Sequence, residues 1–270
     1  MYRNYFLFAE QVRWLHSQIK NCVIEDCFTF RKSELVLQLQ SKETNFLKIG
    51  LISSNPFILL TQSRNIKEAK INFFNEIIGQ KITDIKIHPF DKLVTLNLQE
   101  YYFRIHFYGR QPNILLFDKA DNQISEFKKV KKTSTDLQNN DIINPFDCQF
   151  DNISKTVNND PSLPLEKYLS RHIGGFNLLL ARECCFRANI KSNVIIQQLK
   201  EADFQTLTEN IRQIADEILN PVYKIYFDDV IPKHIAIINF HSFHNLYSEK
   251  NYENVNDAWR NYLYLRFDTE

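Results

Sequence analysis

The segment from His172 to Ala181 contains the residues whose types and spacing are best suited to hold a ligand. Gly174 and Gly175 separate two stretches with helical spacing of apolar residues, and Asn177 follows closely. Glycine and asparagine tolerate a left-handed backbone, so Gly175-Phe176-Asn177 can form the tight turn of a helix-hairpin-helix, with Asn177 in place of its second glycine. Such a hairpin directs the backbone N–H groups of a helix N-terminus towards a phosphate. A plain turn between two packed helices explains the same residues equally well.

A second candidate is the pair Asp91-Lys92, which follows Pro89 between two segments of alternating apolar residues. Proline and aspartate favour a turn, so we expect both side chains to be exposed. A carboxylate beside a cation can fix the direction of that cation and accept hydrogen bonds from a ribose hydroxyl or a base amine. The alternative is an exposed ion pair worth at most about 1 kcal/mol, and the residues alone favour it.

Other signatures of catalysis or metal binding are absent from the sequence. It has no Gly-x-Ser-x-Gly, no P-loop, no Gly-x-Gly-x-x-Gly and no His-Glu-x-x-His. His241 and His244 have Glu249 nearby, but they lack further ligands at set spacing and indicate ordinary polar histidines. The cysteines form no Cys-x-x-Cys pair and are interpreted as buried free thiols: Cys22, Cys27, Cys148, Cys184 and Cys185. We therefore expect no cofactor, no metal and no small-molecule substrate.

The charge of the chain is nearly balanced but unevenly distributed. Its formal net charge is +1, which argues against a protein that wraps nucleic acid by charge alone. Residues 1–150 carry 20 Lys and Arg against 16 Asp and Glu, whereas residues 151–270 carry 13 against 16. The basic excess is greatest at four lysines, which form either a solvated face or a phosphate-contacting patch: Lys128, Lys129, Lys131 and Lys132.

Hydropathy gives the expected compartment. Hydrophobic residues make up 44% of the 270 residues, which is ordinary for a globular protein. No apolar run approaches the roughly 20 residues that span a bilayer. The N-terminus breaks early into polar residues and lacks the small-residue cleavage site of a signal peptide. We therefore expect a cytoplasmic protein without membrane contact.

The elements that would position these candidates change character along the chain. An apolar stripe over residues 5–19 predicts a helix, and period-two alternation then predicts strands up to about residue 130. A second short helix is predicted from Ile66, Ala69, Phe73 and Ile77, ending at Gly79 as its C-cap. Asp118 to Asn122 predicts a hairpin turn. This pattern indicates an α+β protein whose β-rich N-terminal domain, residues 1–150, is built on an antiparallel sheet or barrel.

The second half of the chain is predicted to be mainly helical. Residues 151–164 are rich in Asn, Asp, Ser and Pro and predict a polar linker. Helical spacing over residues 165–221 predicts the helix-hairpin-helix domain. Residues 222–270 predict two returning strands around Asp228-Asp229, and then a helix from Val255 that has little left to pack against.

Residues 71–130 resemble the N-terminal domain of the NFACT family, the group of fibronectin-binding protein A and bacterial ribosome-associated quality-control factors. The resemblance is carried in order by Gly79-Gln80-Lys81-Ile82, Asp91-Lys92-Leu93-Val94, Gly109 to Asp118, and Ile124 to Val130. The hairpin around Gly175, which runs into Leu180-Ala181-Arg182-Glu183, is similar to the family's helix-hairpin-helix. Val255-Asn256-Asp257-Ala258 and Tyr262 resemble the lead-in to its coiled coil. The similarity therefore touches nearly the whole chain.

The sequence departs from the family pattern in two places. Lys92 stands where the family has arginine, and Gln111-Pro112 replaces the usual His-Ser. Lysine keeps the charge but loses the planar fork that reads a base edge, so phosphate contact is the role left for Lys92.

The resemblance implies a module that binds tRNA and the large ribosomal subunit. The whole factor would bind large subunits that still hold an obstructed peptidyl-tRNA and recruit tRNA for template-free tailing of the stalled chain. It implies an N-terminal fold similar to that of the formamidopyrimidine-DNA glycosylases. Beside the hairpin residues Gly174, Gly175 and Asn177, the expected RNA-binding residues are Asp91, Lys92, Arg110, Asn113, Lys128, Lys129, Lys131 and Lys132.

Two other functions stay open at this point. The older family name suggests a fibronectin-binding surface adhesin, which requires export. The glycosylase-like fold suggests a nucleic-acid enzyme, but that chemistry needs an N-terminal proline amine, and the sequence has no proline before Pro56. Base excision is therefore the least supported of the three.

Overall fold

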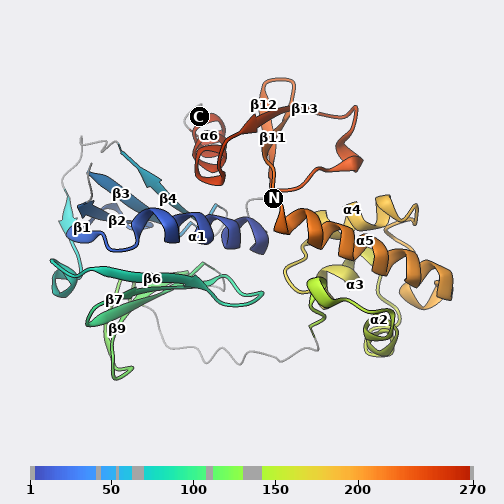
Figure 1. Ribbon diagram of the computed structural model, residues 1–270, viewed down its shortest axis with the longest axis horizontal. Coiled ribbons are helices and arrows are strands. Elements are labelled where there is room, and N and C mark those ends of the chain that lie inside the picture. The colour runs from blue at the N-terminus through green and yellow to red at the C-terminus, as the bar shows by residue number, and fades with distance from the viewer. Residues whose placement is uncertain are drawn as a thin grey trace. The chain divides into compact units, whose positions relative to one another are not determined.

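A computed structural model of the chain describes residues 4–40, 44–52, 55–62, 70–107, 112–129 and 142–267. The chain forms two compact units, an N-terminal unit of residues 2–133 and a C-terminal unit of residues 134–270 (Figure 1). Both combine helices with antiparallel strands, which confirms the predicted α+β class. The units divide between Thr133 and Ser134, earlier than the boundary at residue 150 that the sequence predicts.

The N-terminal unit holds one helix, α1 (Tyr5–Ile19), and two five-stranded antiparallel sheets within its described residues. The first sheet has the order β4-β3-β2-β1-β5 and consists of β1 (Val23–Arg31), β2 (Glu34–Gln40), β3 (Asn45–Gly50), β4 (Phe57–Thr61) and β5 (Ile71–Asn72). The second has the order β10-β9-β8-β7-β6 and consists of β6 (Ile82–Ile87), β7 (Leu93–Leu98), β8 (Tyr101–His106), β9 (Asn113–Asp118) and β10 (Gln123–Glu126).

Helix α1 lies between the two sheets and contacts β4 and β6 (Figure 1). Asn4 caps its first turn by accepting a hydrogen bond from the Phe6 N–H at 2.8 Å. The apolar stripe predicted from sequence is buried, as Phe8, Leu15 and Ile19 show. Because the side chains of β7 alternate, Val94, Leu96 and Leu98 all face this core.

The hairpin predicted between β9 and β10 is confirmed. Asp118 accepts hydrogen bonds at Oδ1 from the N–H groups of Ala120 and Asn122, both at 2.9 Å. Asp121 adopts a left-handed backbone with φ of 67°. An aspartate that closes its own turn in this way holds the two strands in register.

The helix predicted around Ile66–Ile77 is wrong where the structure describes it. Ile71–Asn72 forms strand β5, and Asn75–Ile77 forms only a short 3-10 turn, η1. Asn72 pairs with Phe28 of β1, and the Phe73 N–H donates to the Cys27 carbonyl at 2.9 Å. These distant partners override the local helical spacing. Ile66 and Ala69 lie outside the described residues.

Gly79 marks the crossing from the first sheet to the second. Its φ of 82° is left-handed, as expected of a glycine at a turn, and the element directly before it is the 3-10 turn η1, not the predicted α-helix. Its N–H donates to the Ile24 carbonyl at 2.8 Å, and Lys81 bridges to Val23. The two sheets are therefore joined along β1 and the start of β6.

The C-terminal unit combines a helical part with a three-stranded antiparallel sheet of order β12-β11-β13. Its helices are α2 (Phe150–Val157), α3 (Leu165–His172), α4 (Leu178–Arg187), α5 (Glu201–Leu219) and α6 (Val255–Phe267), with 3-10 turns η2 (Pro145–Asp147), η3 (Ile196–Gln198) and η4 (His241–Phe243). Its strands are β11 (Tyr223–Asp228), β12 (Ile231–Ala236) and β13 (Ser248–Tyr252). The predicted turn at Asp228-Asp229 is confirmed, with Asp229 at a φ of 56°.

The segment predicted as a polar linker belongs to the folded C-terminal unit. Ile153 of α2 is fully buried, and its carbonyl accepts a hydrogen bond from the Tyr168 hydroxyl of α3 at 3.0 Å. Because α2 buries few residues and is otherwise polar, its composition resembles that of a loop. The Val255 helix also differs from expectation, because α6 buries Trp259 and Tyr262 and packs on all three strands.

Two further expectations concern the interior of the protein. All five cysteines are buried and free, as predicted. Burial raises the pKa of Cys148 to about 11 and that of Cys185 to about 12. None of the helices in the described part of the chain is both long and apolar enough to cross a membrane.

Candidate functional site

The Asp91-Lys92 turn joins β6 to β7 and is fixed by its own hydrogen bonds. The His88 N–H donates to the Leu93 carbonyl at 2.9 Å, and the Asp91 N–H donates to the His88 carbonyl at 3.2 Å. Asp91 Oδ1 accepts from the Lys92 N–H at 2.6 Å. Phe90 has a left-handed φ of 54°, which lets the chain reverse here. The turn is therefore preformed.

Asp91 and Lys92 are half-buried, not exposed as the sequence predicts. The Asp91 carboxylate folds back on its own turn, and the Lys92 carbonyl accepts from the Phe107 N–H at 3.2 Å. These hydrogen bonds hold both residues next to the end of β8 in the second sheet, which accounts for their partial burial.

Tyr5 and His106 lie close enough to Asp91 for its carboxylate to influence both of their pKa values. The Tyr5 ring packs on Phe90 at 5.5 Å, and burial, with a smaller contribution from Asp91, raises the pKa of Tyr5. Burial lowers the pKa of His106, an effect that Asp91 opposes and Arg104 reinforces. At neutral pH, Tyr5 and His106 are therefore both uncharged, so neither forms an ion pair with the Asp91 carboxylate.

The other predicted RNA-binding residues of this unit have mixed positions. Asn113 is buried and accepts at Oδ1 from the Lys128 N–H at 2.9 Å, while its Nδ2 donates to the Lys128 carbonyl at 2.8 Å. Asn113 thereby holds β9 to the segment after β10, a structural role. Lys128 is half-buried, burial lowers its pKa, and Lys129 is exposed. Arg110, Lys131 and Lys132 lie outside the described residues.

The glycine hairpin between α3 and α4 is present, with one correction. Gly175 has a left-handed φ of 75°, but Asn177 has a φ of −111° and caps α4 instead, accepting from the Leu180 N–H at 3.0 Å. The Gly174 N–H donates to the Ile143 carbonyl, and the Phe176 N–H donates to the Ile173 carbonyl. Several donors around the turn are thus used inside the unit, which favours a turn between packed helices over a phosphate site.

A buried ion pair ties α4 to the loop that follows β12. Glu183 is fully buried, and its carboxylate accepts from the Arg187 guanidinium at 2.8 Å and from the backbone N–H groups of His241 and Ser242 at 2.8 and 3.1 Å. Arg187 also donates to the Asn239 carbonyl at 2.6 Å and pairs with Glu217 of α5. The hairpin's second helix therefore fixes the course of residues 239–242.

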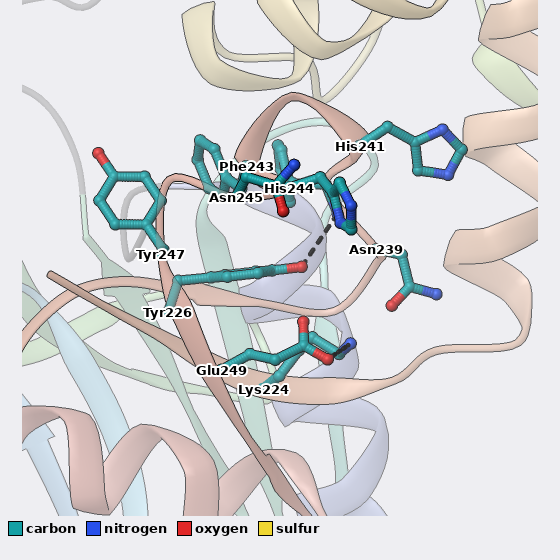
Figure 2. Close-up of a pocket in the computed structure, with 10 residues that line it drawn as sticks. Lys224, Tyr226, Asn239, His241, Phe243, His244, Asn245, Tyr247 and Glu249 are labelled. Carbon is teal, nitrogen blue, oxygen red and sulfur yellow. Dashed lines mark hydrogen bonds and ion pairs between the residues drawn. The ribbon is translucent and has the colours of Figure 1, made fainter. Parts of the chain in front are cut away.

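This loop and two strands enclose a pocket of about 690 Å³, shown in Figure 2. Lys224 and Tyr226 project from one face of β11, and Glu249 lies beside Tyr226 on β13. Lys224 Nζ lies 2.9 Å from Glu249 Oε1, and the Tyr226 hydroxyl accepts from the Phe240 N–H at 3.1 Å. Burial raises the pKa of Tyr226, so its phenol keeps its proton at neutral pH.

Aromatic rings form the wall of the pocket around Phe243. The Phe243 ring stacks on Phe240 and on His234, each at 4.8 Å, and meets Tyr226 and Tyr247 edge to face at 5.0 Å. Exposed polar side chains form the rim: Asn239, His241, His244 and Asn245. Hydrogen-bond donors therefore lie beside flat apolar surfaces.

Sequence reasoning missed this pocket as a site. It noticed His241, His244 and Glu249 only as weak metal ligands, and no group of three or more such side chains in the described residues could hold a metal. The available signal was Lys224, because period-two alternation places it on the same strand face as Tyr226. However, the same face also carries Asp228, so the pattern alone indicates an exposed lysine, and only the fold buries Lys224.

Comparison with known proteins identifies the family and fold. The model of the family described as NFACT N-terminal and middle domains matches residues 5–269. The fibrinogen-binding protein of Staphylococcus aureus is 16% identical with a TM-score of 0.75, covering 96% of this chain and 97% of that one. The N-terminal part of the fibronectin/fibrinogen-binding protein of Streptococcus suis is 15% identical with a TM-score of 0.71, covering 96% and 98%. None of the curated proteins is a significant match.

Proposed function

The chain belongs to the family of NFACT N-terminal and middle domains, and on that premise we propose that it is the tRNA- and ribosome-binding module of a ribosome-associated quality-control factor. In this proposal the factor binds large ribosomal subunits that still hold an obstructed peptidyl-tRNA. It then recruits tRNA for template-free tailing of the stalled chain. Its partners, tRNA and the large subunit, place this work in the cytoplasm.

The observation that carries the tRNA part of the proposal is the preformed turn at Asp91. Its carboxylate has one oxygen committed to the Lys92 N–H, at 2.6 Å, and its neighbours Tyr5 and His106 are uncharged at pH 7. A carboxylate oxygen can accept from a ribose 2′-hydroxyl or a base amine, groups that distinguish RNA by shape and by its sugar. Lys92 supplies a neighbouring cation for phosphate. The fixed backbone means that little ordering is needed on binding.

A second function is favoured by the names of the solved structures. The proteins from Staphylococcus aureus and Streptococcus suis are described as binding fibrinogen, or fibronectin and fibrinogen. Binding of such an extracellular protein is therefore the alternative for this chain.

A paired capture experiment separates the two functions. The purified chain, immobilised, is offered large ribosomal subunits with tRNA, and in parallel fibronectin and fibrinogen. We expect retention of large subunits and tRNA that declines as salt is raised, because the contacts are to phosphates. Retention of fibronectin or fibrinogen with no retention of subunits or tRNA would overturn the proposal in favour of the alternative.

A further inference from the structure

The floor of the pocket in Figure 2 presents hydrogen-bond donors that the protein does not fully use. An ammonium has three N–H donors, and the Lys224 ammonium has one hydrogen-bond partner in the described part of the chain, Glu249 at 2.9 Å. The Tyr226 hydroxyl accepts from the Phe240 N–H, so its own O–H remains available as a donor. Two N–H donors and one O–H donor thus come from neighbouring positions on one face of β11, and both residues line the pocket.

The burial of these groups indicates the charge of their ligand. The Lys224 side chain is 9% exposed, whereas the Glu249 side chain is 47% exposed. The carboxylate is therefore well solvated, while the cation depends on partners that the pocket supplies. Glu249 supplies one counter-charge, and a buried ammonium with further N–H donors can hold a second anionic oxygen beside it, so this floor suits an anion. His241 and His244 on the exposed rim can add further donors.

The size and walls of the pocket indicate that the ligand is larger than an inorganic anion. A volume of about 690 Å³ lies within the range of about 300–1,000 Å³ for organic ligands. Phe243 is itself buried by its stacked neighbours, whereas Tyr247, which packs against its edge, is only half-buried and can present part of its ring. The Asn239 and Asn245 amides can each donate and accept, as the hydrogen-bonding edge of a base requires. The combination fits a phosphate joined to a planar heterocycle.

We propose that this pocket binds one nucleotide, with its phosphate at Lys224 and Tyr226 and its base against Tyr247. The nucleotide comes either from an unpaired position of an RNA strand or from free nucleotide, since both present the same chemistry. The site lies in the C-terminal unit and uses none of the residues of the Asp91 turn. A test of this site is therefore independent of the tRNA proposal.

Titration calorimetry of the whole chain tests the site with adenosine 5′-monophosphate, adenosine, ribose 5-phosphate and a short oligoadenylate. We expect the monophosphate to bind more tightly than adenosine or ribose 5-phosphate, because each of these lacks one of the two recognised parts. A tighter oligoadenylate assigns the site to an RNA strand, and equal affinity assigns it to free nucleotide. Failure of both the monophosphate and the oligoadenylate to bind would overturn the proposal.

Variants then locate the binding. Lys224→Met should weaken monophosphate binding about tenfold or more, because it removes a charge-assisted hydrogen bond. Lys233→Met is the matched control, since Lys233 lies on β12 and pairs with Asp228 at 3.2 Å, outside the pocket lining. Equal affinity of the Lys224→Met and Lys233→Met proteins would place the ligand elsewhere and contradict the assignment.

A third variant, expected to bind the monophosphate more tightly, keeps the proposal testable if Lys224→Met does not fold. Glu249→Gln leaves the ammonium in place and removes the carboxylate that competes for it, so monophosphate binding should become several-fold tighter. Unchanged or weaker binding by Glu249→Gln would overturn the proposal. Asp91→Asn should leave monophosphate binding unchanged, which separates this site from the tRNA-binding turn.

Discussion

Glu183 and Arg187 form an ion pair inside α4 in which the carboxylate is fully buried and the guanidinium side chain is 3% exposed, with Oε1 and Nε 2.8 Å apart. The same carboxylate accepts from the backbone of His241 and Ser242. A buried ion pair adds little net stability compared with an apolar pair. Removal of the Glu183 carboxylate would leave the N–H groups of His241 and Ser242 without their acceptor, whereas Arg187 would keep its pair with Glu217. The pair thus commits the loop after β12 to one position.

Glu183→Ala should lower the free energy of unfolding by about 1–3 kcal/mol for each backbone donor that loses its acceptor, namely the N–H groups of His241 and Ser242. Glu183→Gln should cost less, since its amide oxygen can still accept from the His241 N–H. The matched control is Arg182→Ala, which breaks the exposed pair with Glu166 (2.7 Å) and should cost less than about 1 kcal/mol. Urea unfolding measures all three proteins. Equal losses for Glu183→Ala and Arg182→Ala would show that the buried pair has no special role.

A second prediction concerns acid stability and His234. Burial lowers the pKa of His234 from 6.5 to about 4, and its Nδ1 is buried without a hydrogen-bond partner in the described structure. Between pH 6.5 and 4, His234 is therefore protonated in the unfolded chain but stays neutral in the folded protein. Stability should be full above pH 6.5 and should fall as the pH is lowered towards 4.

His234→Phe tests this prediction, because phenylalanine preserves a ring against Phe243 and cannot titrate. Urea midpoints at several pH values between 4 and 8 should fall less steeply for this variant than for the wild type. Identical slopes would mean that other groups carry the acid dependence.

A third prediction concerns limited proteolysis. The units divide between Thr133 and Ser134, and few contacts cross a domain boundary, so brief trypsin treatment should first cut near Lys128–Lys132. Residues 150–157 should resist, although they read as a linker, because α2 is packed through Ile153. Mass spectrometry of the fragments identifies the sites. Early cuts within β1–β8 or α2 would contradict this two-unit organisation.

The sequence predicted elements whose signals are local. The stripe of α1, the Asp118–Asn122 turn and the turn at Asp229 depend on residues next to one another in the chain, and all three are confirmed. Prediction failed where a distant partner decides the outcome. Phe73 has helical spacing but bonds to Cys27 of β1.

The candidate sites show the same contrast between features set by neighbouring residues and features set by distant partners. The Asp91 turn was found from its own residues, but its partial burial depends on Tyr5 and Phe107, which are distant in sequence. Asn177 was expected in a left-handed conformation because asparagine allows it, whereas its side chain instead caps α4. The pocket joins β11, β13 and a loop held by Glu183, and only the fold brings these together.

The most direct test of the proposed function is the amount of tRNA that copurifies with the protein on large ribosomal subunits, compared between the wild type and Asp91→Asn. Asparagine keeps an oxygen that can accept from the Lys92 N–H, so the turn should stay folded and the melting temperature unchanged. Lys92→Ala serves as a second loss variant, and Lys92→Arg, which restores a guanidinium fork, should bind at least as well as the wild type.

Loss of a charge-assisted contact costs about 1.5–3 kcal/mol, so we expect copurified tRNA to fall roughly tenfold or more in Asp91→Asn and in Lys92→Ala. Wild-type amounts of tRNA on Asp91→Asn, or a loss seen only together with early melting, would contradict the role of this turn in tRNA binding.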